Sequence, residues 1–373
     1  LQLGYQPLHL GRFDLLSGTN VLSVNDLREG SAIFPELDEV GQLAARLDYD
    51  VSSWLSLRLL YVPFFTPHIV SVAEGDFAMF RANQASVDMS LGAFGLTSLF
   101  AANLTRSDRE RIAETTLAAF APEPSFENQQ AAFRATMHGT AGEIGLTAVT
   151  ALEHLPYFRV SQDLIDATLN PESVPAGDRL DANPKPITVE YKRFAVFSID
   201  GAIDIAPVQL GIELAYMLRR TLYTVGTGPF PLDLPLPEQT DIAHAGLRLE
   251  YTSGTEWAFV LESFFSYATR LPVNPERAWM FMERGRYAAG AGGALVWNSD
   301  FGLTIELAGI GLTGPSVVFL PRIGYALFDG VDVALGALIV DGRTPPPTIT
   351  PNLAIGGLYD TVDMAFVGFR YSP

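Results

Sequence analysis

Charged side chains recur at alternate positions inside otherwise apolar stretches of this sequence. In 242–251, His244, Arg248 and Glu250 alternate with apolar residues, and Glu213 has a similar place in 208–218. A period of two places the charged and the apolar side chains on opposite faces of a β-strand. Arginines and carboxylates gathered on one face of a closed sheet would create a transverse electric field that selects among solutes.

We predict that thirteen charged residues line such an interior and act as selectivity residues. They are Arg46, Asp48, Arg58, Arg134, Glu190, Lys192, Glu213, Arg248, Glu250, Glu262, Arg286, Glu306 and Arg322. A second interpretation stays open, in which cross-strand ion pairs only stabilise a plugged interior. The direction of selectivity is also open, because arginines favour anionic solutes and carboxylates favour cations.

Composition excludes several classes of protein. The 373 residues are 48% hydrophobic and 18% charged, with a formal net charge of -18 and no cysteine. The negative charge argues against nucleic-acid binding, the 11% aromatic content argues against disorder, and thiol chemistry is excluded. The five histidines lack metal-ligand spacing and Gly-x-Ser-x-Gly does not occur, so we predict no catalytic residue, cofactor or metal. A hydrolase that uses a serine with His154 is a minor alternative.

Period-two alternation predicts about sixteen strands, within a range of 14 to 18. They cover 1–10, 43–50, 54–65, 83–92, 95–104, 130–138, 143–155, 187–199, 207–218, 242–251, 255–267, 286–297, 301–312, 316–328, 331–341 and 361–371. Their length suits the roughly 9 to 11 residues of a tilted transmembrane strand. The fold class is therefore all-β, a transmembrane antiparallel up-and-down β-barrel in which 1–373 form a single domain. The region 84–104 could instead be one strand followed by a helix.

The connections alternate between short and long. Short turns are expected at 139–142, 200–201, 252–254, 298–300 and 329–330. Long segments are expected at 156–186, 219–241, 268–285 and 342–360, with 313–315 as the one short exception. Outer-membrane barrels have short periplasmic turns and long extracellular loops, so this parity places both termini at the periplasmic end. The capping box formed by Ser107 and Glu110 predicts a short loop helix that ends before Pro122, and 162–169 is a second candidate helix.

Aromatic residues and one family resemblance support the same class. Aromatics such as Trp54, Trp257 and Trp297 stand near strand ends, as in interfacial girdles. The start of the chain resembles Gram-negative outer-membrane proteins of largely unassigned function that are related to alginate-export porins. The matching residues are Gly4, Gln6, Gly11, Asp14, Asn25, Asp26 and Arg28.

The resemblance extends to 133–157 and 213–216, although Leu10 replaces the family's tryptophan and the proline between Asn25 and Asp26 is missing. It implies a barrel through which small or oligomeric solutes cross the outer membrane. Because the family's first motif usually follows further sequence, residue 1 need not be the mature N-terminus.

We therefore expect a porin-like channel of the bacterial outer membrane that passes a polar or amphipathic solute passively through a charged lumen. Its partners would be outer-membrane lipid, lipopolysaccharide and the small-molecule solute. One alternative is a closed structural barrel whose loops or lumen dock a protein or lipoprotein. A transporter of hydrophobic substrates is another, suggested by the apolar residues of the proline-rich segment 228–237. A soluble β-rich protein is the third.

Overall fold

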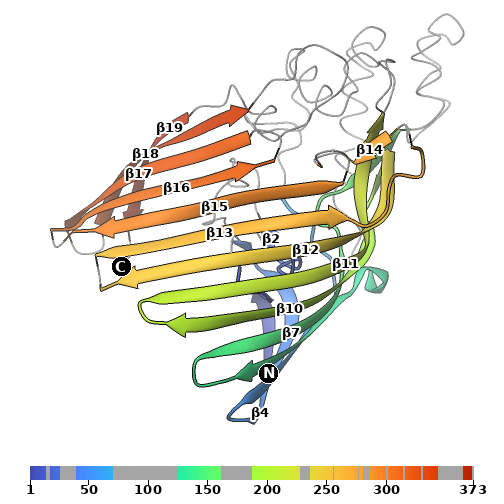
Figure 1. The fold of residues 1–373 in the computed structure, drawn as a ribbon, viewed down its shortest axis with the longest axis horizontal. Helices are drawn as coiled ribbons and strands as arrows, with labels where there is room; N and C mark the ends of the chain where they lie inside the picture. The colour runs from blue at the N-terminus through green and yellow to red at the C-terminus, as the bar shows by residue number, and fades with distance from the viewer. Residues whose placement is uncertain are drawn as a thin grey trace, which may run out of the picture.

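A computed structural model shows that the residues whose structure is described form mainly β-strands (Figure 1). It describes residues 1–13, 17–25, 39–69, 125–160, 187–226, 236–254, 256–275, 277–279, 282, 286–299, 301–313, 316–328, 331–342 and 364–371. Within these ranges, no helix is long and apolar enough to cross a bilayer. The helical content described is one 3₁₀ turn, Phe126–Asn128.

Fifteen of the described strands form one antiparallel sheet. Fourteen of them follow one another in chain order: β1 (Gln2–Gln6), β4 (Gln42–Ser52), β5 (Leu55–Val62), β6 (Gln130–His138), β7 (Gly142–Leu152), β10 (Arg193–Ile205), β11 (Val208–Gly226), β12 (Leu236–Ser253), β13 (Trp257–Ala268), β15 (Tyr287–Asn298), β16 (Leu303–Leu312), β17 (Ser316–Phe328), β18 (Val331–Gly342) and β19 (Met364–Tyr371). The fifteenth, β14 (Arg277–Trp279), pairs with β11. Two ribbons pair β2 (Val24–Asn25) with β3 (Glu39–Val40), and β8 (Tyr157–Val160) with β9 (Ile187–Glu190).

Most of the predicted strands are confirmed within a few residues, and the bounds of β6 and β17 coincide with the prediction. The predicted strands 83–92 and 95–104 and the predicted helices at 107–120 and 162–169 lie outside the described residues. Among the described strands, β5 pairs directly with β6.

The predicted turn at 200–201 is wrong. Strand β10 continues through Asp200 and Gly201, which pair with Glu213 and Ile212 of β11, and the chain turns at Ala206–Pro207 instead. Asp and Gly are typical turn residues, but Asp200 here accepts hydrogen bonds from an arginine on the same face of the sheet. A tertiary ion pair therefore keeps these two residues in a strand.

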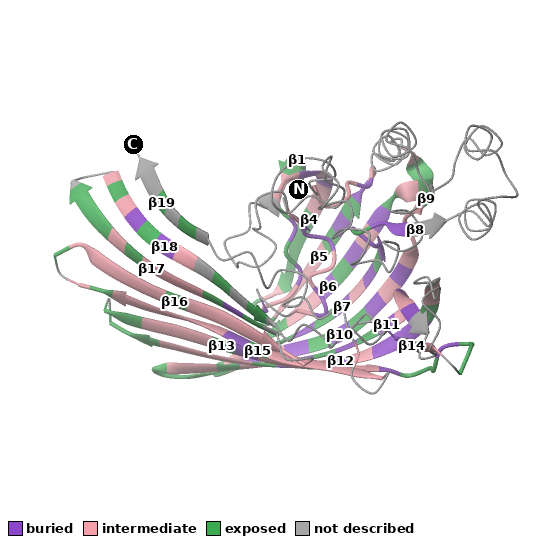
Figure 2. Ribbon diagram, turned by 90° about the horizontal axis from the view of Figure 1, so that it is seen from above, coloured by how far each residue is buried: buried purple, intermediate pink, exposed green. Residues whose placement is uncertain are grey.

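Short turns lie at one end of the sheet, and the connections at the other end are long except for 313–315 between β16 and β17, as predicted. The turns after β4, β6, β10, β12, β15 and β17 define the short-turn end, and the opposite edge is the long-loop end. Tyr371 pairs with Val331, so the last described residue lies at the short-turn end. Figure 2 shows the sheet strongly curved, with β1 and β19 as the outermost strands of the curve.

The two faces of the sheet differ in polarity and in exposure, and Figure 2 shows buried and exposed residues alternating along several strands. On β11, Leu210, Ile212 and Leu214 are 42–49% exposed, whereas Glu213 between them is fully buried. We call the side of these apolar residues the outer face. The opposite side, which residues 7–25 contact, is the inner face. A continuous apolar surface of this kind is unusual for soluble proteins and is what contact with lipid requires.

Aromatic pairs lie near both ends of the strands. Trp257 and Trp297 face each other on β13 and β15 at the short-turn end, with ring centroids 6.1 Å apart. Phe265 and Tyr287 are 6.0 Å apart on the same two strands toward the long-loop end. These places agree with the interfacial girdles predicted from the sequence.

The inner face has two layers. The apolar layer, toward the long-loop end, consists of Leu8, Leu10, Leu22, Ala44, Leu60, Val62, Ala132, Val149, Ala151, Phe194, Val196, Ala215, Met217 and Ile242. The charged layer, nearer the short-turn end, contains Arg134, Asp200, Glu213, Arg248 and Glu262. Residues 7–25 contact both layers.

Candidate functional site

Residues 7–25, described at 7–13 and 17–25, leave the sheet after β1 and run along its inner face. We call them the inner segment. Leu8, Leu10 and Leu22 are almost completely buried in the apolar layer. Phe13 packs against Gly246 of β12, where a β-carbon would lie 3.2 Å from the phenyl ring. The segment therefore occupies space that would otherwise belong to an open interior.

Glu213 anchors the inner segment. Its carboxylate accepts a hydrogen bond from the backbone N–H of Gly18 at 2.6 Å and another from Ser17 Oγ at 3.0 Å. Hydrogen bonds to a buried carboxylate are among the stronger ones in proteins, because the acceptor is charged. A β-carbon at Gly18 would lie only 2.7 Å from the ring of His244 on β12, so close docking requires glycine.

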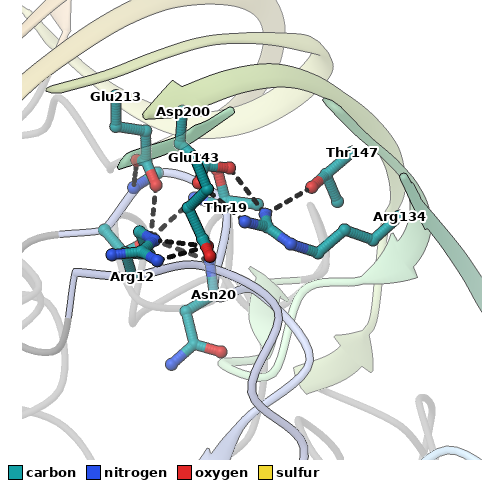
Figure 3. A network of polar contacts seen from close by, with 10 residues as sticks. Arg12, Thr19, Asn20, Arg134, Glu143, Thr147, Asp200 and Glu213 are labelled. Carbon is teal, nitrogen blue, oxygen red and sulfur yellow. Dashed lines mark hydrogen bonds and ion pairs between the residues drawn. The ribbon is translucent and has the colours of Figure 1, made fainter. Parts of the chain in front are cut away.

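A second contact joins the inner segment to the short-turn end of the sheet (Figure 3). Arg12 donates from Nε to Glu143 of β7 at 2.9 Å, and Arg248 donates from Nη1 to the Arg12 carbonyl at 3.2 Å. Arg248 also pairs with Glu262 at 2.6 Å and Glu250 at 3.0 Å. These contacts join the Arg248 cluster of the charged layer to the inner segment.

Arg134 and Asp200 form the most buried ion pair of the charged layer (Figure 3). Two parallel hydrogen bonds of 2.6 and 2.7 Å join the guanidinium to the carboxylate, and Arg134 also donates to Thr147 at 2.9 Å. Gly145 leaves the space that the guanidinium occupies, since a β-carbon there would overlap it. This geometry fixes both side chains on the inner face.

The structure brings most of the predicted lumen residues to the inner face, as ion pairs. Besides the pairs above, Arg46 and Arg58 both bind Asp48, at 2.7 and 2.6 Å, and Arg322 binds Glu306 at 3.2 Å. These side chains retain some exposure, unlike Arg134 and Asp200.

Three predicted residues lie elsewhere. Glu190 ends the small β8–β9 ribbon and forms an ion pair with Lys192 beside it, so neither belongs to a strand of the large sheet. Arg286 precedes β15 and donates to the hydroxyl of Tyr267 at 2.7 Å, near the long-loop end. Alternation alone could not distinguish a strand of the large sheet from a strand of a small ribbon in a loop.

The motif residues of the family resemblance are partly described. Gln6 donates to the Ala44 carbonyl, Gly11 lies beside Ser17, and Asn25 donates from its backbone to His68. Gly4 has φ of +142°, which is accessible to glycine. Asp14, Asp26 and Arg28 lie outside the described residues.

A cavity of about 470 Å³ lies between the inner segment and the sheet, toward the long-loop end. Its walls come from the inner segment, from 152–155 and from inner-face residues of β10, β11, β12, β13 and β15. Apolar side chains such as Phe194, Met217, Ile242 and Phe264 form much of its surface. It has the size and the mixed lining of a site for a small organic molecule.

A β-bulge aims Arg220 into this cavity. The register of β11 against β12 shifts between Met217 and Arg220, and Arg219 has the left-handed φ of 57°. The extra residue reverses the alternation, so that Arg220 faces the interior as Met217 does. The guanidinium lies 4.4 Å from the ring centre of Phe194 and donates from Nε to Glu153 at 2.9 Å.

Glu153, His154 and His68 form the polar wall of the cavity beside Arg220. Burial raises the pKa of Glu153, although the charge of Arg220 opposes the shift. Burial lowers the pKa of His68 to about 3 and that of His154 to about 4, with the charge of Arg220 acting in the same direction. Both imidazoles are therefore neutral at pH 7.

The floor of the cavity is polar as well. His244 Nδ1 lies 2.9 Å from Ser266 Oγ, and the imidazole stacks on Phe264 with centroids 5.8 Å apart. His244 Nε2 is 3.6 Å from Glu213, which is longer than a hydrogen bond. This geometry suits recognition of a polar group better than activation of the serine.

Acidification should loosen the wall that contains the two histidines. Their pKa values in the folded protein lie below the ordinary value of 6.5, so the folded state binds fewer protons than the unfolded state. The contribution of the neutral histidines to the free energy of unfolding is fully present above pH 6.5 and is lost as the pH falls toward 3 or 4. At pH 5 the loss reaches about 2 kcal/mol per histidine.

We expect amides in 17–25 and 65–69 to exchange faster at pH 5 than at pH 7, after correction for intrinsic rates. Because the pKa of Glu153 is raised, its protonation favours the folded state as the pH falls, whereas protonation of the histidines disfavours it. The double variant His68→Gln/His154→Gln therefore isolates the contribution of the two histidines. An equal pH response in that variant would contradict the assignment.

Sequence reasoning missed several residues of this site. Asp200 was assigned to a turn, and Arg220 was placed in a long connection beginning at 219. The inner segment was not foreseen, because its polar contacts are 131 and 195 residues away in the chain. The alternation around His244 and Glu213 indicated part of this region, and His154 was named as a candidate residue, although for a hydrolase.

Comparisons with known proteins find structural similarity but no match by sequence. No family model matches the chain, and no curated protein matches its sequence. Solved structures with a similar arrangement include the siderophore receptor PirA from Pseudomonas aeruginosa, at 7% identity and a TM-score of 0.34. That alignment covers 57% of this chain and 38% of the receptor, so the chain spans less than half of the receptor's length.

Two further structures align over more of their own length. The toluene transporter TodX of Pseudomonas putida is 9% identical, with a TM-score of 0.30 and coverage of 80% of this chain and 77% of that one. OmpT of Vibrio cholerae, expressed in the outer membrane, is 10% identical, with a TM-score of 0.28 and coverage of 67% and 91%. None of these findings shows a relation to alginate-export porins.

Proposed function

We propose that the chain is a channel of the bacterial outer membrane that passes a small amphipathic solute through its interior. The observation that carries the proposal is the cavity between the inner segment and a sheet whose outer face is apolar. Residues 1–373 act as one domain, surrounded by outer-membrane lipid and lipopolysaccharide.

The outer face supports the membrane location. Leu247 is 60% exposed on that face, while Glu262 on the neighbouring strand is fully buried on the inner side. The strands of the wall, such as β13 with 12 residues, are long enough to cross a hydrocarbon core of about 30 Å at a tilt. Short turns would then face the periplasm and long connections the exterior.

The inner face supports passage of an amphipathic solute. The apolar layer and the cavity lie toward the long-loop end, and the charged layer follows toward the short-turn end. A solute would meet the cavity first and the charged layer afterwards. The docked inner segment narrows this route, which favours a selective channel over a wide pore.

Planar-bilayer recording of the detergent-purified protein tests the proposal. We expect discrete conductance steps with weak ion selectivity in a salt gradient, because ion pairs join the charges of the layer. A strong preference for one ion would show that unpaired charges govern the narrowest point. Silence from protein shown to be inserted would contradict passage and would favour a barrel that docks a protein or lipoprotein.

A further inference from the structure

We propose that the cavity binds a small uncharged amphiphile, with its apolar body against the aromatic and aliphatic wall and one hydrogen-bonding group at the His244–Ser266 floor. This inference rests on the proposed function, because it names the class of solute that would occupy the route. Three features of the cavity carry it: the apolar wall, the polar floor and the pairing of the ionised side chains.

The apolar wall favours a hydrophobic body. Phe194 and Phe264 present aromatic rings, and Met217, Ile242 and Met282 add flexible or branched aliphatic surface. Burial of apolar area against such side chains stabilises a ligand by roughly 25 cal/mol per Å² before the costs of association. Methionines also adapt their shape to ligands of different outline.

The polar floor favours one hydrogen-bonding group. His244 and Ser266 line the cavity, and their contact of 2.9 Å places an imidazole and a hydroxyl side by side. A hydroxyl can donate and accept, and a neutral imidazole does one of each. A ligand hydroxyl or carbonyl therefore finds a matching partner here in either tautomer of His244.

The charges of the wall disfavour an ionic ligand. Of the described residues that line the cavity, Arg220 supplies the guanidinium and Glu153 the carboxyl group, and they bind each other at 2.9 Å. The histidines of the wall are neutral at pH 7, since their pKa values are low. An ion that entered would lose its hydration without gaining an uncompensated opposite charge, which is costly.

Titration of the purified protein with three matched probes tests the class of ligand. Benzyl alcohol, benzoate and benzylamine share one ring and differ in the charge of one group at pH 7.5. We expect calorimetry in detergent to show benzyl alcohol binding roughly tenfold or more tightly than either ion. Benzoate or benzylamine binding as tightly as the alcohol would overturn the proposal.

Two variants of β15 test whether benzyl alcohol binds in the cavity. They also distinguish this binding from partition of benzyl alcohol into detergent micelles. Ala288 lines the cavity, so Ala288→Phe should fill it and abolish the titration of benzyl alcohol. Ala294 lies on the same strand and face but outside the lining, so Ala294→Phe should leave the titration unchanged. An unchanged titration with Ala288→Phe would overturn the assignment of the site.

A change of specificity tests the role of the paired charges. Glu153→Gln leaves Arg220 without its carboxylate, so benzoate should bind about tenfold more tightly than to the wild type. Benzyl alcohol should change by less than about twofold, because its binding uses the floor. Glu238→Gln is the matched control, since Glu238 bonds to Thr224 and Val273 outside the cavity.

The outcomes separate this inference from the proposed function. Titration needs no passage across a membrane, and conductance needs no ligand. Binding of benzyl alcohol by a protein that is silent in bilayers would disprove the channel while keeping the ligand class. Conductance without binding, or with preferential binding of benzoate to the wild type, would keep the channel and overturn the ligand class.

Discussion

Valine in place of Gly18 will raise the single-channel conductance, by about twofold or more, because a wider open cross-section conducts more ions. The β-carbon alone would lie 2.7 Å from the His244 ring and 3.0 Å from the Met217 methyl group, and the two methyl groups of valine add to this crowding. The inner segment must then leave Glu213, which holds it through the Gly18 N–H and Ser17 Oγ. The measurement is the step size in a planar bilayer.

Gly311→Val is the matched control for this experiment. Its β-carbon would meet the nearest heavy atom at 3.9 Å, so the larger side chain fits and the conductance should stay at the wild-type value. A Gly18→Val protein that inserts and keeps the wild-type step size would show that the inner segment does not limit the route.

Alanine in place of Asp200 will destabilise the folded protein by about 3 to 5 kcal/mol, the typical effect of removing one partner from a buried ion pair. Asp200 is 1% exposed, and its carboxylate receives two hydrogen bonds from Arg134. The guanidinium would remain buried with its charge uncompensated. The free energy of unfolding in urea, measured in lipid vesicles, gives the effect.

Two controls separate loss of the charge pair from loss of the side chain. Asp50→Ala changes an exposed aspartate near the short-turn end and should alter the free energy of unfolding by less than about 0.5 kcal/mol. The double variant Arg134→Met/Asp200→Leu should be more stable than Asp200→Ala alone, because no buried charge remains. If all three variants unfold alike, the ion pair contributes nothing specific.

Alternation in the sequence predicted most of the wall, since a strand between lipid and an interior must change polarity at every residue. Arg134, Glu213 and Arg248 were placed on the inner face for that reason, and Glu213 is fully buried between the exposed Ile212 and Leu214. The same rule failed for Glu190, because a short ribbon in a loop can show the same pattern as a wall strand.

The rest of the site depends on contacts that no local pattern contains. Arg220 faces the cavity because one extra residue at the bulge reverses the alternation, and nothing in 217–220 indicates where the register shifts. Asp200 stays in a strand because Arg134, 66 residues earlier in the chain and two strands away in the sheet, donates to its carboxylate. The fold class follows from periodicity, whereas the cavity follows from a few long-range partners.

The docking of the inner segment also has a consequence for the order of assembly. Arg12 needs Glu143 and Gly18 needs Glu213, and these two acceptors share a face only after β7, β10 and β11 have paired. Contacts across such separations form late, because the loop they close must first lose its conformational freedom. Although residues 7–25 precede β7, β10 and β11 in the chain, they would dock last, and their docking would complete folding.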